Sequence, residues 1–293
     1  MKKNGLIIFI LLIFTSLFLV FLTQKNAIEN TQKIKVTASF YPLYDFAKNV
    51  GGDKTEVINI TPAGSEPHDF DPTPQDIVNI QKSKLFIYND INLERWTDKL
   101  LPDLGSHIIK ASNGINITSS DPHVWLDPVL AQIEVKNITQ ALKAADHQNQ
   151  SIYDANSQNY INKLKTLDTE FKVGLSSCTS RDFITSHQAF GYLASRYNLN
   201  MISIAGFSPD AEPSPQTLAN LANFGKNHNV KYIFFESLVS PKLSQTLAQE
   251  LGAKTLVLDP IEGLTADRIK SGENYISLQR QNLANLRLAL NCK

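Results

Sequence analysis

The sequence predicts a two-lobed α/β protein in which two series of alternating strands and helices flank one long helix. Short runs rich in β-branched and aromatic residues, bounded by turn residues, indicate the strands. The first series begins with the alternating strand 34–40 and the second with the strand 182–185. Between them lies a helical segment, 151–175, which rises ~1.5 Å per residue and can join two lobes rigidly. Its apolar positions follow helical spacing and form one stripe: Tyr153, Tyr160, Leu164, Leu167 and Phe171.

The first series starts as a strand–helix–strand unit. A helix begins near Pro42 and ends at Gly51-Gly52, and a second strand follows at 56–60. Thr73-Pro74-Gln75-Asp76 has the pattern of a helix start, because an acid stands three residues after the capping threonine. The other elements predicted in this half are a helix ending near Lys82, strands 85–88 and 108–109, a helix 92–101 and a helix from Pro128 to about Ala145. The other strands predicted in the second half are 200–204, 230–235 and 255–258, with helices between them.

Length and charge limit the classes of function. The chain has 293 residues, 42% of them hydrophobic, which is enough for two ordinary globular domains. We place an N-terminal lobe at 34–150, a linker helix at 151–176 and a C-terminal lobe at 177–293. Basic and acidic residues each number 28, so the formal net charge is zero. This balance does not indicate binding to nucleic acid or to anionic lipid. We expect the protein to be a monomer.

The N-terminus predicts export. A basic start is followed by an almost wholly apolar run, 6–22, which is the pattern of a signal peptide. Residues 1–25 are therefore a signal peptide or an N-terminal anchor, and 26–33 form a tether. No cysteine follows the apolar run, which argues against a lipid-anchored lipoprotein. The run is slightly shorter than the ~20 residues of a typical spanning helix, and we favour cleavage over a retained anchor. Export to an oxidising compartment lets Cys178 and Cys292 pair, and we favour this disulfide over two free buried thiols.

One histidine stands in an unusually constrained loop, Asp121-Pro122-His123-Val124-Trp125-Leu126-Asp127-Pro128. The two prolines fix φ and remove two donors, so the segment cannot continue a helix or a central strand. Asp127-Pro128 has the pattern of an N-cap and a first helical residue, which places His123 just before a helix. A nearby carboxylate can accept the second ring N–H of an imidazole, as occurs at metal sites. Taken alone, this motif more often marks a satisfied loop histidine, with Trp125 as a core anchor.

Three further residues occupy comparable positions. His68 follows the second predicted strand, His187 follows the first strand of the second half, and Asp259 follows the last strand. Open α/β sheets place ligand groups at the carboxyl ends of their strands. With His123 these residues supply three imidazoles and one carboxylate, a tetrahedral set suited to zinc in the interlobe cleft. The remaining histidines have polar surroundings and are interpreted as surface residues: His107, His147 and His228.

The three histidine segments, in this order, resemble the ligand motifs of the zinc-binding solute-binding proteins of ABC importers. The segments are Gly64-Ser65-Glu66-Pro67-His68, Asp121 to Pro128, and Thr185-Ser186-His187-Gln188-Ala189-Phe190-Gly191-Tyr192. The opening Ser39-Phe40-Tyr41-Pro42-Leu43 and the closing Leu258-Asp259-Pro260 also fit, and the similarity runs from about Ile34 to the C-terminus. The resemblance implies two Rossmann-like lobes with central, mostly parallel sheets, joined by one rigid helix, with metal between them. It also implies that the metal is bound by His68, His123, His187 and Asp259, although water takes the fourth place in some members.

The resemblance further implies a role in transport. Such a protein captures Zn²⁺ in the periplasm and delivers it to a permease and its ATPase in the inner membrane. Many zinc-specific members carry a loop rich in histidine and acidic residues between the first two motifs, whereas 105–120 holds only His107. This difference argues against an accessory metal-collecting site. In the manganese and iron branch of the family the third ligand is a carboxylate, whereas His187 supplies an imidazole.

Three functions are alternatives to zinc transport. A manganese- or iron-binding member of the same family would use a similar cleft. A zinc hydrolase with a three-histidine site is less favoured, because the chain lacks two histidines one helical turn apart with an intervening glutamate. Asp259 would also close the fourth position to substrate water. Glu66 is the candidate general base for such a reaction, but it equally suits a supporting or capping carboxylate. A purely adhesive surface protein is the third alternative.

Overall fold

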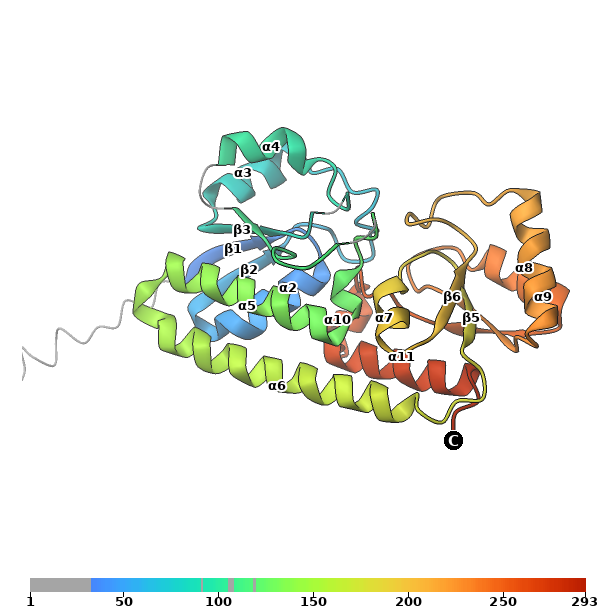
Figure 1. The fold of residues 1–293 in the computed structure, drawn as a ribbon. Helices are drawn as coiled ribbons and strands as arrows, with labels where there is room; N and C mark the ends of the chain where they lie inside the picture. Colours follow the sequence, from blue (N-terminus) through green and yellow to red (C-terminus); the bar gives the residue numbers. More distant parts are fainter. Residues whose placement is uncertain (1–32, 91, 105–107, 118–119) are drawn as a thin grey trace, which may run out of the picture. The chain divides into compact units, whose positions relative to one another are not determined.

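The computed structural model describes residues 33–90, 92–104, 108–117 and 120–293. Ile34–Lys293 form one compact unit (Figure 1). The predicted signal peptide or anchor, the tether apart from its last residue, and His107 lie outside the described residues. Within the described ranges, no helix is both long and apolar enough to cross a membrane.

Each half of this unit contains one parallel four-stranded sheet. The first sheet has the order β2-β1-β3-β4, and its strands are β1 (Ile34–Ala38), β2 (Thr55–Asn59), β3 (Leu85–Tyr88) and β4 (Ile108–Lys110). The second has the order β6-β5-β7-β8, and its strands are β5 (Asp182–Thr185), β6 (Asn200–Ser203), β7 (Tyr232–Phe235) and β8 (Lys254–Val257). The predicted α/β class is confirmed. In both sheets the strand order reverses beside the first strand, between β1 and β3 and between β5 and β7, and open α/β sheets bind ligands at such a point.

Helices cover both faces of the sheets. Figure 1 shows α3 and α4 on one side of the first sheet, and α2 and α5 on the other. In the second half, α8 and α9 pack against Ile184 and Ile233 of the second sheet. The helices are α2 (Tyr41–Gly51), α3 (Pro74–Lys82), α4 (Thr97–Leu104), α5 (Pro128–Ala145), α6 (Gln150–Gly174), α7 (Gly191–Arg196), α8 (Pro215–Asn227), α9 (Lys242–Leu251), α10 (Ala266–Lys270) and α11 (Tyr275–Ala289). Within the described ranges, three short 3₁₀ turns accompany them: η1 (Gly52–Lys54), η3 (Val124–Leu126) and η4 (His147–Asn149).

Most predicted helix starts are correct, and one is wrong. Thr73 and Asp76 form the predicted capping box at α3, and the side chain of Asp127 accepts the N–H of Val129 at the start of α5. The helix predicted from residue 92 begins instead at Thr97. The reason is local, because Asp90 and Asn92 have positive φ values of 71° and 64°, which a right-handed helix cannot contain.

The long helix α6 lies against elements of both halves. It contacts α2 and α5 from the first half and α11 from the second, and Figure 1 shows it running beneath α5 and α11. The phenol of Tyr160 on this helix donates a buried 2.6 Å hydrogen bond to Asp45 of α2. Tyr275 of α11 also reaches the first half, where its ring meets Phe46 at 4.9 Å in an edge-on arrangement. One continuous apolar core therefore joins the layers of the two sheets.

Cys178 and Cys292 form the predicted disulfide. The bond joins the segment before β5 to the residues that follow α11. It therefore ties the C-terminus of the chain to the start of the second sheet.

Candidate metal centre

Four side chains from four separate loops meet in one group. His68 follows β2, His123 directly precedes η3, His187 follows β5, and Glu262 follows β8. One ligand atom from each lies within 4.8 Å of the others. The side chains of His123, His187 and Glu262 are fully enclosed, and that of His68 is 7% exposed. The three predicted histidines are thus brought together, although long stretches of sequence separate them.

Five of the six separations between donor atoms are close to those of a small tetrahedral site, and the sixth lies within 4.8 Å. His123 Nε2 lies 3.3 Å from His68 Nε2 and 3.2 Å from His187 Nε2. Glu262 Oε1 lies 3.0 Å from His123 Nε2, 3.2 Å from His68 Nε2 and 3.7 Å from His187 Nε2. A tetrahedral zinc ion with bonds of ~2.0–2.1 Å would separate its ligand atoms by about 3.3 Å. The group therefore has the dimensions and the donor types, three nitrogens and one oxygen, of a four-coordinate zinc site.

Two carboxylates behind the group orient two of the imidazoles. Asp121 Oδ1 lies 2.7 Å from His123 Nδ1 and also accepts the backbone N–H of His123 at 3.0 Å. Glu236 Oε1 lies 2.5 Å from His187 Nδ1 and also accepts the hydroxyl of Ser186. When Nδ1 donates its proton to a carboxylate, Nε2 keeps its lone pair and can face a metal. The role of Asp121 follows the sequence prediction of a carboxylate beside His123.

Glu236 was missed in the sequence. It stands directly after β7, and β7 is the neighbour of β5 in the sheet. The two parallel strands end side by side at the point where the strand order reverses, so His187 and Glu236 meet there. The available signal was the position of an acid at a strand's carboxyl end, but only the strand order makes the two residues neighbours.

The ionisable side chains of the group shift one another's pKa values. Burial lowers the pKa of His123, but hydrogen bonds to Asp121 and Glu262 outweigh it and raise the pKa overall. Burial likewise opposes protonation of His187, yet Glu236 and then Glu262 raise its pKa well above the usual value. Burial raises the pKa of Glu262, but the three imidazoles hold it well below its usual range. Glu262 is therefore an ionised acceptor, and protons on the imidazoles compete with any cation that enters.

Glu66 lies at the edge of the group. Both of its carboxyl oxygens are buried and lack a hydrogen-bond partner among the described residues. Burial, and then the negative charge of Glu262, raise the pKa of Glu66 to about 10. Burial and the charge of Glu262 thus both favour the neutral form of the Glu66 carboxyl.

Asp259, the fourth site residue predicted from the sequence, is not part of this group, in which Glu262 takes the fourth place. Asp259 Oδ2 accepts from Ser237 at 2.7 Å and from Arg268 at 2.5 Å, while Oδ1 accepts the backbone N–H of Ile261 at 2.7 Å. Both oxygens are thus engaged away from the imidazoles. The loop turns at Ile261, and the next residue, Glu262, faces the histidines.

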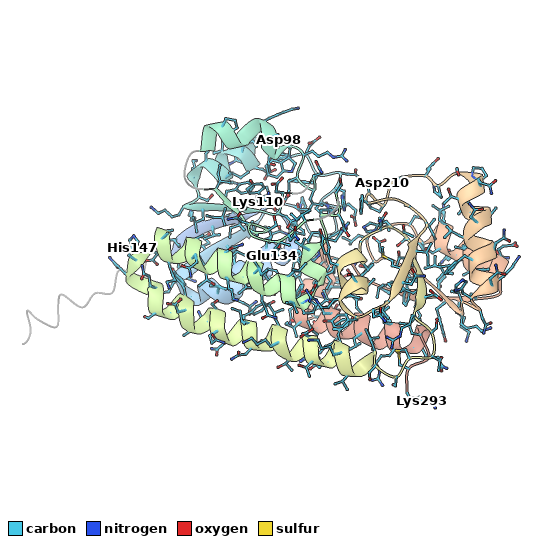
Figure 2. All side chains as sticks on the ribbon, viewed as in Figure 1. Asp98, Lys110, Glu134, His147, Asp210 and Lys293 are labelled. Carbon is cyan, nitrogen blue, oxygen red and sulfur yellow. A yellow bond between two sulfur atoms is a disulfide. The ribbon has the colours of Figure 1, made fainter. Side chains whose placement is uncertain are left out.

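The remaining histidines of the described chain lie apart from this group. His147 is exposed in the 3₁₀ turn between α5 and α6, where Figure 2 labels it. His228 is exposed at the end of α8 and pairs with Asp182 at 2.8 Å. Both agree with their interpretation as surface residues.

Comparisons with known proteins identify similar chains. Residues 36–289 match the family model described as zinc-uptake complex component A, periplasmic. The high-affinity zinc uptake system protein ZnuA of Bacillus subtilis is 41% identical over 290 residues, which cover 92% of this chain and 91% of that protein. The zinc-binding protein AdcA of Streptococcus pyogenes is 38% identical over 91% of this chain, but the match spans only 58% of AdcA. The crystal structure of the Zn(II)-bound ZnuA-like domain of Streptococcus pneumoniae AdcA has a TM-score of 0.80 at 39% identity and covers 89% of this chain and all of that domain.

Proposed function

This chain belongs to the family of zinc-uptake complex component A, and we propose that it captures Zn²⁺ outside the cytoplasm and delivers it to a membrane permease driven by an ATPase. The observation that carries the proposal is the buried group of three imidazole nitrogens and one carboxylate oxygen, His68, His123, His187 and Glu262. Neutral imidazoles and a carboxylate are ligands that zinc accepts readily in four-coordinate geometry. The proposed site is therefore one for tight capture of the transported ion.

The donor set favours zinc over manganese or iron. Mn²⁺ favours oxygen ligands, whereas imidazole suits zinc, and zinc also stands above manganese in affinity for the same ligands. The group offers only one oxygen donor, Glu262 Oε1, among three nitrogens. Binding of manganese or iron is therefore the less favoured function of this site.

The same geometry argues against a hydrolase. A catalytic zinc site keeps one position open for water or substrate, whereas a structural or carrier site is closed by protein ligands. Here Glu262 supplies the fourth donor, and the side chains of His123, His187 and Glu262 are fully enclosed. Binding followed by release suits this arrangement better than turnover of a substrate.

The remaining parts of the proposal concern the organisation and the location of the protein. We propose an N-terminal lobe at 34–150, a linker helix at 151–176 and a C-terminal lobe at 177–293, with α6 forming most of the linker. The protein acts as a periplasmic, or more generally extracytoplasmic, monomer, with the N-terminal apolar run as its signal peptide or anchor. The disulfide between Cys178 and Cys292 fits an oxidising compartment.

The test is metal binding by the purified chain and by matched histidine variants. Protein isolated without chelator is expected to contain one zinc ion per chain by elemental analysis. His123→Ala removes a ligand and should weaken zinc binding by more than about a hundredfold. This loss exceeds the effect of removing a residue that only hydrogen-bonds to a metal ligand. His147→Ala, at an exposed histidine, is the control and should bind as tightly as the parent chain.

Two results would contradict the proposal. One is a parent chain that takes up no zinc in competition with a chelator. The other is equal zinc affinity in the His123 and His147 variants, which would remove the buried group as the binding site.

A further inference from the structure

The residue before Glu262 has an unusual backbone conformation. Ile261 has a φ of 60°, while the other described non-glycine residues with positive φ are all aspartate or asparagine. A β-branched residue in the left-handed region is a genuine outlier, because its Cβ crowds the backbone. Ile261 is also fully buried, so its side chain is held in the core while its backbone is strained. Strain of this kind persists only where surrounding contacts enforce it.

Asp259 supplies the contact that enforces this turn. Its Oδ1 accepts the backbone N–H of Ile261 at 2.7 Å. The backbone of Asp259 is itself fixed on both sides, since its N–H donates to Asn282 at 2.8 Å and its carbonyl accepts from the Asn282 amide at 2.7 Å. The carbonyl of Pro260, between them, accepts the indole N–H of Trp125 at 2.8 Å. Each residue before Glu262 in this loop is thus held by a specific hydrogen bond.

The other oxygen of Asp259 is held just as firmly. Oδ2 accepts from the hydroxyl of Ser237, which follows β7, and from the guanidinium of Arg268 on α10. Arg268 is fixed in turn by Glu273 at 2.8 Å. The carboxylate therefore cannot rotate away from the N–H of Ile261 without breaking an ion pair that is largely shielded from water.

We propose that Asp259 is a positioning residue of the metal site: it holds Ile261 in the left-handed conformation that directs Glu262 toward the three imidazoles. The inference rests on the proposed function. Without the acceptor at Asp259, residue 261 relaxes toward negative φ, and the rotation carries the Glu262 side chain away from His68, His123 and His187. Asp259 thereby acts on the metal without touching it.

A double-mutant cycle on zinc affinity tests this role. Asp259→Ala should weaken zinc binding roughly tenfold, which corresponds to ~1.4 kcal/mol and lies within the left-handed penalty of a non-glycine residue. Ile261→Gly removes that penalty, because glycine adopts positive φ at no steric cost. In the Ile261→Gly background, Asp259→Ala should therefore cost less than about threefold. A conservative variant, Asp259→Asn, keeps an oxygen acceptor and should bind between the parent and Asp259→Ala.

Controls separate positioning from general damage to the fold. Asp45→Asn changes another buried carboxylate, which accepts from Tyr160, and is expected to leave zinc affinity within about twofold. Hydrogen exchange of the Ile261 amide in metal-free protein is a second measurement. It should be protected in the parent chain and exchange faster in Asp259→Ala. The proposal is overturned if Asp259→Ala costs the same in both backgrounds, or if the Ile261 amide keeps its protection. A parent chain without zinc affinity would instead count against the proposed function, and the amide measurement would still decide the positioning role.

Discussion

Trp125 donates its indole N–H to the carbonyl of Pro260 over 2.8 Å, and so joins the turn that follows His123 to the loop that carries Glu262. The ring of Trp125 also meets Phe40 edge-on at 4.7 Å. The backbone carbonyl of Trp125 accepts the phenol of Tyr275 from α11. One buried side chain thus connects ligand segments that lie far apart in the sequence.

We expect Trp125→Phe to destabilise the protein by about 1–3 kcal/mol, because the buried carbonyl of Pro260 loses its donor. Zinc affinity should fall as well, since the loop that carries Glu262 loses one of the hydrogen bonds that hold it in place. Denaturant unfolding and chelator competition measure the two effects. Trp96→Phe is the matched control, because the buried indole N–H of Trp96 has no hydrogen-bond partner among the residues that the structure describes, and it should cost less stability. Equal losses for both tryptophans would contradict a specific role for the Trp125 hydrogen bond.

Zinc affinity should fall as the pH is lowered, beginning above the ordinary histidine value of ~6.5. The sign follows from the raised pKa values of His123 and His187, since zinc binds only unprotonated imidazole and these two rings keep their protons to higher pH. Asp121→Asn removes a carboxylate that raises the pKa of His123. It should move the pH midpoint of binding downward and weaken binding at high pH about 10- to 100-fold. Affinity measured by chelator competition across the pH range checks both effects, and an unchanged midpoint in the variant would refute this account.

His187→Glu should lower the preference for zinc over manganese. The change replaces an imidazole by an anionic oxygen donor, which Mn²⁺ favours. Because Glu236 lies directly behind this position, the variant is best paired with Glu236→Gln to avoid repulsion between two carboxylates. His187→Gln in the same background separates the effect of charge from the loss of the imidazole. Competition titrations with the two metals give the preference, and an identical ratio in parent and variant would remove His187 as the selectivity residue.

Removing the disulfide should lower stability and leave zinc binding intact. The bond between Cys178 and Cys292 spans 114 residues, and closing a loop of about 100 residues contributes up to about 4.7 kcal/mol in the chain-entropy description. Unfolding of the Cys178→Ala/Cys292→Ala variant measures the loss, with zinc affinity as the internal control. Two reactive thiols per parent chain, counted in denaturant without reductant, would contradict the presence of the bond.

Zinc binding should order loops more than it closes the lobes. The 25-residue helix α6 contacts elements of both halves, and the continuous core beside it resists a hinge motion. The radius of gyration from solution scattering is therefore expected to change little on addition of zinc, while hydrogen exchange slows in the segments around His68 and Glu262. A large decrease in the radius would show that lobe closure dominates.

The sequence alone determined the architecture and three of the four members of the candidate site. Strand alternation, helix spacing and capping residues are local signals, and they predicted each strand with bounds within two residues. His68, His123 and His187 were identified because each follows a strand or precedes a helix, and the carboxyl ends of parallel strands share one edge. Cys178 and Cys292 were paired because only two cysteines are present in an exported chain.

Only the tertiary structure decided which acid completes the group. Asp259 and Glu262 lie in the same loop, and local pattern favoured the acid at the end of the strand. The choice depends on the backbone turn at Ile261, which a single dihedral angle sets. It also depends on hydrogen bonds from Arg268 and Trp125 to this loop, and the sequence pattern of the loop does not contain these contacts. Glu236 reaches His187 for a related reason, since strand order makes them neighbours. The direction in which a side chain points is fixed by such long-range contacts, and sequence spacing does not encode it.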